Sequence, residues 1–113
     1  MRTLTIGVSD RATANRRFLS AMAGKRQGEF LSFSSLELLH KVLTPRRVRI
    51  LEALQRVGPI GLRALARTLG MDAGNLARDL KPLKEFGLVV ETEQGLAVPY
   101  DEIRLEVVIR KVA

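Results

Sequence analysis

The sequence has no cysteine and no tryptophan, and among its 113 residues it has one histidine, one tyrosine and four phenylalanines. The absence of cysteine excludes disulfide bonds, thiolate catalysis and cysteine-ligated zinc or iron-sulfur sites. The single histidine, His40, cannot build a histidine triad or a multi-histidine metal cluster. We therefore expect no metal, no cofactor and no enzymatic activity.

Long apolar runs are also missing. No run approaches the roughly 18 residues that a membrane span needs, and the first ten residues alternate instead of forming the apolar block of a signal peptide. A hydrophobic content of 46% still supplies one core, which aliphatic side chains must fill because aromatic residues are scarce. We expect a cytoplasmic protein that makes no membrane contact.

The positive charge is concentrated in the middle of the chain. Residues 40–84 carry ten lysines and arginines against three acidic residues, whereas residues 1–39 have a net charge of +3 and residues 85–113 a net charge of −3. A dense cationic surface favours a polyanionic partner, because each cation that neutralises a phosphate releases counterions. Ordinary solvated helix faces are the alternative that charge alone leaves open.

Alternating apolar residues predict a strand at each end of the chain. Leu4, Ile6 and Val8 share one face of a strand over residues 3–8, and the same alternation runs through residues 101–110. A lone strand with an apolar face must pair, and the amino-terminal strand is the obvious partner of the carboxy-terminal one. The pattern leaves open whether they pair within one chain or between chains.

The segment between the first strand and the basic middle contains three further expected elements. Asp10 caps an expected helix that runs to about Lys25, and residues 29–33 form a short strand. Ser34, with Glu37 three residues later, has the spacing of a capping box and predicts the start of a second helix.

A third helix begins at Thr44-Pro45, where threonine suits the N-cap and proline the first helical position. Val48, Leu51, Leu54 and Val57 are expected to face inward. Gly58-Pro59 ends this helix, and Ile60 is expected to add one short strand rung.

The next stretch has the sequence form of a helix-turn-helix. Leu62, Leu65, Ala66 and Leu69 lie on one face of a short helix, which ends at Gly70. A following helix, capped by Asp72, has its inward leucines at positions 76, 80 and 83. Two helices joined by a tight turn with glycine are typical of this DNA-binding motif.

A predicted β-hairpin follows the second of these helices. The run Gly87-Leu-Val-Val90 is followed by a turn at residues 92–95 and by Leu96, Ala97 and Val98. A hairpin in this place is the wing of a winged helix. The expected tip, Glu93, Gln94 and Gly95, is acidic, which weakens the contact of a wing with DNA.

The run from Leu62 to Glu91, LRALARTLGMDAGNLARDLKPLKEFGLVVE, resembles winged-helix transcriptional regulators of the MarR and ArsR type. Over residues 30–110, including SFSSLELLHKVLTPRRVRILEAL and VPYDEIRLEVVIR, the chain is similar to a family of small prokaryotic DNA-binding proteins. Members of that family often act as antitoxins. The resemblance implies binding to an operator, often that of the protein's own promoter, and a toxin protein as a partner.

These observations give an α+β fold with a winged helix-turn-helix at residues 41–98. Residues 1–40 form a strand-helix extension and residues 99–113 a carboxy-terminal strand, both of them candidate dimerisation segments. The expected protein is a sequence-specific transcriptional regulator that binds double-stranded DNA. It is expected to be a homodimer that represses its own promoter and acts as the antitoxin of a toxin-antitoxin pair. A winged helix that serves only as a protein-protein interaction module is the alternative.

Nine residues are predicted to contact DNA. Asn and Arg side chains suit adenine and guanine edges, so the second helix of the motif is expected to read bases, while arginines elsewhere bind phosphates. The predicted residues are Arg46, Arg47, Arg63, Arg67, Ala73, Gly74, Asn75, Arg78 and Lys81. Pro82 departs from this pattern, because it lacks the N–H that would bond to Arg78 and should bend or end the helix.

Overall fold

The structure is a computed structural model that describes residues 1–8, 28–109 and 111. The expected helix from Asp10 to about Lys25 lies outside the described residues. Residue contacts divide the chain into two units, residues 1–40 with 102–113 and residues 41–101. The described part holds four helices and two small sheets, a mixed α and β composition that is compatible with a winged helix.

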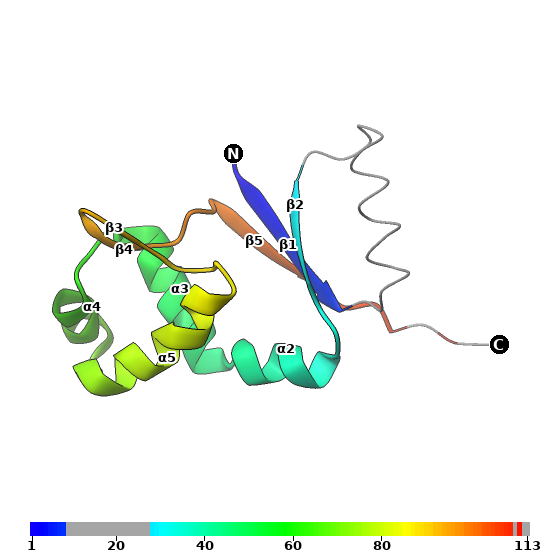
Figure 1. Ribbon diagram of the computed structural model, residues 1–113, viewed down its shortest axis with the longest axis horizontal. Helices are drawn as coiled ribbons and strands as arrows, with labels where there is room; N and C mark the ends of the chain where they lie inside the picture. The colour runs from blue at the N-terminus through cyan, green and yellow to red at the C-terminus, as the bar shows by residue number, and fades with distance from the viewer. Residues whose placement is uncertain (9–27, 110, 112–113) are drawn as a thin grey trace. The chain divides into compact units, whose positions relative to one another are not determined.

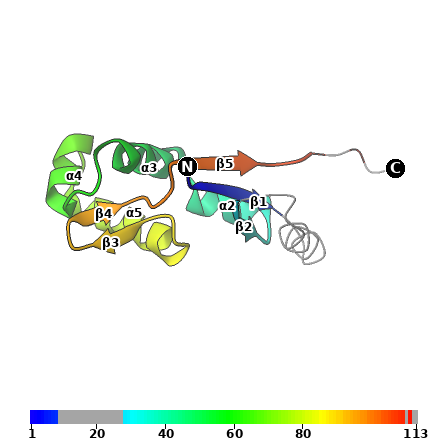
Figure 2. The ribbon, with the colours of Figure 1, turned by 90° about the horizontal axis from the view of Figure 1, so that it is seen from above.

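The first unit contains a three-stranded parallel sheet with strand order β2-β1-β5 (Figures 1 and 2). Its strands are β1 (Thr3–Val8), β2 (Glu29–Phe33) and β5 (Glu102–Glu106). The central strand is the most buried, as a strand paired on both sides should be, and Ile6 is fully buried. The two terminal segments therefore pair within one chain in the structure, Ile6 of β1 lying opposite Leu105 of β5.

Helix α2 (Leu36–Val42) follows β2, and its start differs from the predicted capping box. Ser35, not Ser34, accepts a hydrogen bond from the N–H of Leu38 (3.1 Å). The prediction is wrong by one residue because the helix begins at Leu36, so the residue directly before it, Ser35, is the N-cap.

In the second unit, α3 (Pro45–Val57) begins as predicted. Thr44 is the N-cap and its hydroxyl accepts a hydrogen bond from the N–H of Arg47 (3.2 Å). The inward face differs from the prediction, because Ile50 and Ala53 are buried along with Leu51 and Leu54. Val57, expected to face inward, is exposed in the last turn.

Helices α4 (Leu62–Leu69) and α5 (Ala73–Glu85) come next, followed by the antiparallel pair β3 (Val90–Thr92) and β4 (Gly95–Ala97). Ile60 forms the predicted rung as an isolated bridge with Leu96, and both backbone hydrogen bonds are present, at 3.0 and 2.8 Å. The core joins these elements and consists mainly of leucine: Leu54, Leu65, Leu76, Leu80, Leu83, Leu88 and Leu96.

Gly95 permits the close approach of the hairpin to Ile60. Its φ is 132°, and a β-carbon there would lie 2.6 Å from the Ile60 carbonyl carbon. Real β-carbons essentially never lie that close to backbone atoms, so a side chain at this position would push β4 away from the bridge.

Helix α5 contains Pro82 and runs on to Glu85. Of the two alternatives expected for Pro82, a bent helix or a helix that ends earlier, the second is therefore wrong. Proline removes one N–H donor, but the neighbouring Leu80 and Leu83 are fully buried, and their burial favours continuing the helix across the missing bond.

Candidate nucleic-acid interface

The turn between α4 and α5 is fixed by backbone hydrogen bonds. Gly70 has the left-handed φ of 65°, its N–H donates to the Arg67 carbonyl (3.2 Å), and the Met71 N–H donates to the Ala66 carbonyl (2.9 Å). This pair of bonds is a Schellman motif, which ends α4 sharply. Asp72 then caps α5 by accepting from the N–H of Asn75 (3.0 Å), so only three residues separate the helices.

Helix α5 has a buried face and an exposed face. Leu76, Leu80 and Leu83 are buried, which fixes the rotation of the helix about its axis. The opposite face exposes the residues that the sequence predicts to contact bases: Gly74, Asn75, Arg78 and Lys81. Ala73, at the first turn, is half-buried.

Asn75 and Arg78 form a pair on this exposed face. The Arg78 Nη1 donates a hydrogen bond to Asn75 Oδ1 at 2.6 Å, as residues three apart on one helix face can do. The contact orients the guanidinium along the helix surface. Both side chains have the bidentate groups that recognise purine edges in a major groove.

Helix α4 contributes two more exposed cations, Arg63 and Arg67. They lie opposite the buried residues Leu65 and Ala66 of the same helix. Position and charge both suit the first helix of a helix-turn-helix, whose cations contact phosphates and set the register on the duplex.

Arg46 and Arg47, also predicted to contact phosphates, hold the carboxylate of Asp79 in α5. Asp79 Oδ1 accepts hydrogen bonds from Arg46 Nη2 (2.9 Å) and Arg47 Nε (3.1 Å), while Oδ2 lies 2.8 Å from Arg46 Nε as an ion pair. The Asp79 side chain is 3% exposed, that of Arg47 19% and that of Arg46 63%. The Arg47 side chain is thus largely buried, whereas most of the Arg46 side chain is exposed to solvent.

Arg47 also binds the end of the preceding helix. Its Nη1 donates to the carbonyl oxygens of Lys41 (2.9 Å) and Val42 (3.2 Å), which close α2. One guanidinium therefore joins residues 41 and 42, the start of α3, and the buried face of α5. The phosphate-binding role of Arg46 and Arg47 stays a prediction, and the structure adds an internal role for both.

The Asp79 carboxyl is ionised at neutral pH. Burial on its own would raise the pKa of Asp79, but the hydrogen bonds and the charges of Arg46 and Arg47 outweigh burial and hold the pKa below its ordinary value. The hydrogen bond and charge of Asp79 in turn raise the pKa of Arg46.

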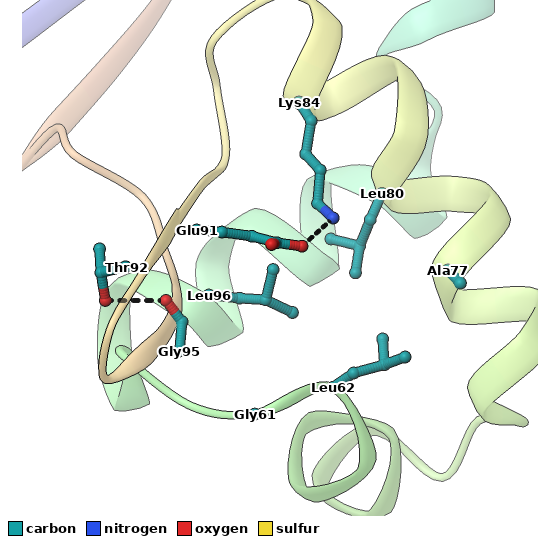
Figure 3. A pocket seen from close by; sticks show the side chains of 9 residues that line it. All are labelled: Gly61, Leu62, Ala77, Leu80, Lys84, Glu91, Thr92, Gly95 and Leu96. Carbon is teal, nitrogen blue, oxygen red and sulfur yellow. Dashed lines mark hydrogen bonds and ion pairs between the residues drawn. The ribbon is translucent and has the colours of Figure 1, made fainter.

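The hairpin is tied to the end of α5 by an ion pair between Lys84 Nζ and Glu91 Oε1. Figure 3 shows the two side chains meeting at one side of a pocket that lies between the start of α4, α5 and the hairpin. The volume of this pocket is about 210 Å³. The pocket is lined mainly by small and apolar residues, among them Leu62, Leu80 and Leu96. Because Glu91 neutralises Lys84, the hairpin side of the candidate interface carries little free positive charge.

The Asp79 cluster was not predicted as a functional feature. Asp79 lies three residues after Leu76 and next to Leu80, so helical periodicity places a carboxylate on the inward face. A buried carboxylate requires a cationic partner. An aspartate on the inward face of this helix, in a chain that also has two arginines shortly after Thr44, could therefore have predicted the cluster. The described part of the chain has no group of three or more histidine, aspartate or glutamate side chains placed to hold a metal ion. None of its helices has both the length and the hydrophobicity of a membrane span.

Two comparisons with known proteins match the part of the chain that holds this candidate interface. The sequence profile of the HVO_A0114 family matches residues 42–105, which include α3, α4, α5 and the hairpin. The HTH-type transcriptional regulator NmtR of Mycobacterium tuberculosis is 36% identical over 62 residues, which cover 55% of this chain and 51% of that protein. The chain thus spans about half the length of the curated relative it matches.

Proposed function

Because the chain belongs to the HVO_A0114 family and is similar to an HTH-type transcriptional regulator, we propose that it is a DNA-binding transcriptional regulator. In this proposal residues 41–98 are a winged helix-turn-helix, with α5 as the recognition helix and β3-β4 as the wing. The observation that carries the proposal is the exposed face of α5, where Asn75 and Arg78 lie together while the opposite face is locked into the core.

The proposed contacts divide into two classes. Gly74, Asn75, Arg78 and Lys81 would face base edges, with the half-buried Ala73 entering the groove at the start of α5. Arg63, Arg67 and the exposed side of Arg46 would bind phosphates. Arg47 would act on this surface through Asp79, by holding α5 in place.

We further propose that the protein is a homodimer that represses its own promoter. Two copies would present two α5 helices to successive major grooves about 34 Å apart on a near-palindromic operator. The toxin partner that the sequence resemblance implies stays a prediction, since no described feature adds support for it.

The test is fluorescence anisotropy with DNA from directly upstream of the gene and with a scrambled duplex of the same length. We expect tighter binding to the upstream DNA. Equal, weak and salt-insensitive binding to both duplexes would support the alternative, a winged helix that binds only proteins.

Variants of one residue separate base reading from phosphate binding. Arg78→Lys keeps the charge but loses the planar fork, so it should lose most of the preference for the upstream site and keep binding to the scrambled duplex. Arg67→Ala should weaken both duplexes nearly equally. Arg56→Ala, an exposed arginine in the last turn of α3, removes the same charge outside α4 and α5 and is the matched control.

A further inference from the structure

The strand β5 combines an open edge with an alternating side-chain pattern. In the sheet order β2-β1-β5 it is paired on one side only among the described residues. Leu105 in this strand is 51% exposed and Val107, just after it, is 43% exposed, so apolar surface continues past the end of β5. An edge of this kind is a template for a further strand.

The backbone direction shows which groups face the open edge. The N–H of Glu102 donates to the carbonyl of Arg2, beside β1 (3.3 Å). Since hydrogen-bonding groups alternate along a strand, Arg104 and Glu106 direct theirs toward β1 as well. The N–H and C=O groups of Ile103 and Leu105 therefore face the open edge.

The charges on β5 are self-complementary in one antiparallel register. If two β5 strands pair about Leu105, Arg104 of each copy lies opposite Glu106 of the other, giving two cross-strand ion pairs. Ile103 then lies opposite Val107, and Leu105 opposite its own counterpart. Opposite charges directly across a strand pair stabilise it, as do apolar pairs.

The neighbouring registers are poorer. Pairing about Arg104 places Arg104 opposite Arg104 and Glu102 opposite Glu106, so every charged pair is repulsive. Pairing about Ile103 restores attraction between Arg104 and Glu102 but places Leu105 opposite Asp101. Of these three registers, only the one about Leu105 satisfies the charges and the apolar residues together.

We propose that β5 pairs antiparallel with β5 of a second copy about Leu105, so that two three-stranded sheets form one six-stranded sheet. This deepens the proposed homodimer and rests on it. Such pairing is isologous and closes after two copies, because each β5 has only one open edge. A second copy of β5 is a better partner than an unrelated strand. When the strand is paired antiparallel with its own copy, each arginine at position 104 lies opposite a glutamate at position 106.

Charge reversal tests the register without DNA. Arg104→Glu and Glu106→Arg each turn both cross-strand pairs into repulsive ones, and we expect each to raise the dimer dissociation constant at least about tenfold in sedimentation equilibrium. Mixed one to one, the two variants should form a heterodimer of about wild-type affinity, because both pairs are again attractive. If the substitutions instead weakened the dimer by disrupting contacts within each chain, mixing the two variants would not restore the affinity.

A second mixture discriminates between registers. Glu102→Arg mixed with Arg104→Glu makes both cross-strand pairs attractive only if the strands pair about Ile103, because one of the two pairs stays repulsive in the register about Leu105. Rescue to wild-type affinity in this mixture, or no rescue in the first one, would overturn the proposed register. Circular dichroism of each variant alone checks that the chain is folded.

Cysteine substitution offers an independent measurement, because the wild-type chain has no cysteine. Residues opposite each other in a hydrogen-bonded pair have Cα atoms about 5.5 Å apart, within disulfide reach. Leu105→Cys should therefore cross-link to itself under mild oxidation, whereas Ile103→Cys should not, since its two copies lie about 14 Å apart. Mixing Ile103→Cys with Val107→Cys should give a cross-linked heterodimer.

The outcomes separate this proposal from the proposed function. A chain that is monomeric at tens of micromolar, or a dimer in which Leu105→Cys stays uncross-linked, overturns the β5 interface even if the protein binds its operator. A cross-linked dimer with no affinity for DNA supports the interface and leaves the regulator proposal refuted.

Discussion

The sharpest stability prediction concerns Asp79→Ala. The substitution removes a carboxylate that is 3% exposed and accepts hydrogen bonds from two arginines. Arg46, at 63% exposed, returns to water with little cost, but Arg47, at 19% exposed, is left as a largely buried cation whose charge no longer has a partner. The loss of folding stability in Asp79→Ala therefore comes mainly from the unpaired charge of Arg47.

The magnitude follows from these exposures. Removing one partner of a fully buried ion pair costs about 3 to 5 kcal/mol, and an exposed pair is worth about 0 to 1 kcal/mol. Arg47 keeps its hydrogen bonds to two carbonyl groups, so we expect Asp79→Ala to lower the free energy of unfolding by about 2 to 3 kcal/mol. Arg46→Ala should cost under about 1 kcal/mol.

Urea unfolding followed by far-ultraviolet circular dichroism at pH 7 measures both values. The double variant Asp79→Ala with Arg47→Met removes the buried cation that would have no partner. Its loss in free energy of unfolding should therefore be at least about 1 kcal/mol less than the sum of the losses of the two single variants. A loss below about 1 kcal/mol for Asp79→Ala, or additivity within about 0.5 kcal/mol, would refute the reasoning.

The pH dependence has a definite sign. The folded pKa of Asp79 is lowered, so its stabilising effect is complete above the unfolded pKa of about 3.9 and disappears as the pH falls through the folded pKa. The stability difference between the wild type and Asp79→Ala should be constant from pH 7 to about pH 5 and shrink below about pH 4. A difference that instead grows in acid would contradict the assignment.

Two further substitutions test the fold. Gly95→Ala should destabilise the protein by more than Gly70→Ala, because both glycines have positive φ but only Gly95 meets backbone atoms, those of Ile60. We expect about 1 to 2 kcal/mol at Gly70 and about 2 to 4 kcal/mol at Gly95 by urea unfolding. Equal losses of stability in the two variants would show that the hairpin can move away from Ile60 without destabilising the protein, and would contradict this prediction. Ser35→Ala should cost about 1 kcal/mol and Ser34→Ala less than about 0.5 kcal/mol, and the reverse order would restore the capping box predicted from the sequence.

The elements with strong local signals could be predicted from the sequence. Thr44-Pro45, Gly70 and Asp72 act within one helical turn of themselves, so their caps and turns are as expected. The two terminal strands are also found, because alternation over five or six residues has no helical reading, although the carboxy-terminal one ends at Glu106 and residues 107–109 do not continue it.

Features that depend on contacts between residues far apart in the sequence could not be predicted from local patterns. Asp79 is 33 residues from Arg46, and no local pattern states which arginine it binds. The choice between Ser34 and Ser35, the exposure of Val57 and the course of α5 through Pro82 are likewise decided by packing. Propensity is a weak guide at such places, because tertiary contacts override it.

The most direct test of the central claim is the salt dependence of DNA binding by the full chain. A surface that neutralises about six phosphates should give a slope near −5 in a plot of log affinity against log salt, about a thousandfold loss between 50 and 200 mM. We predict this slope for the wild type with the scrambled duplex, and a slope less steep by about one for Arg67→Ala. A wild-type slope near zero would contradict the assignment of α4 and α5 as a nucleic-acid interface.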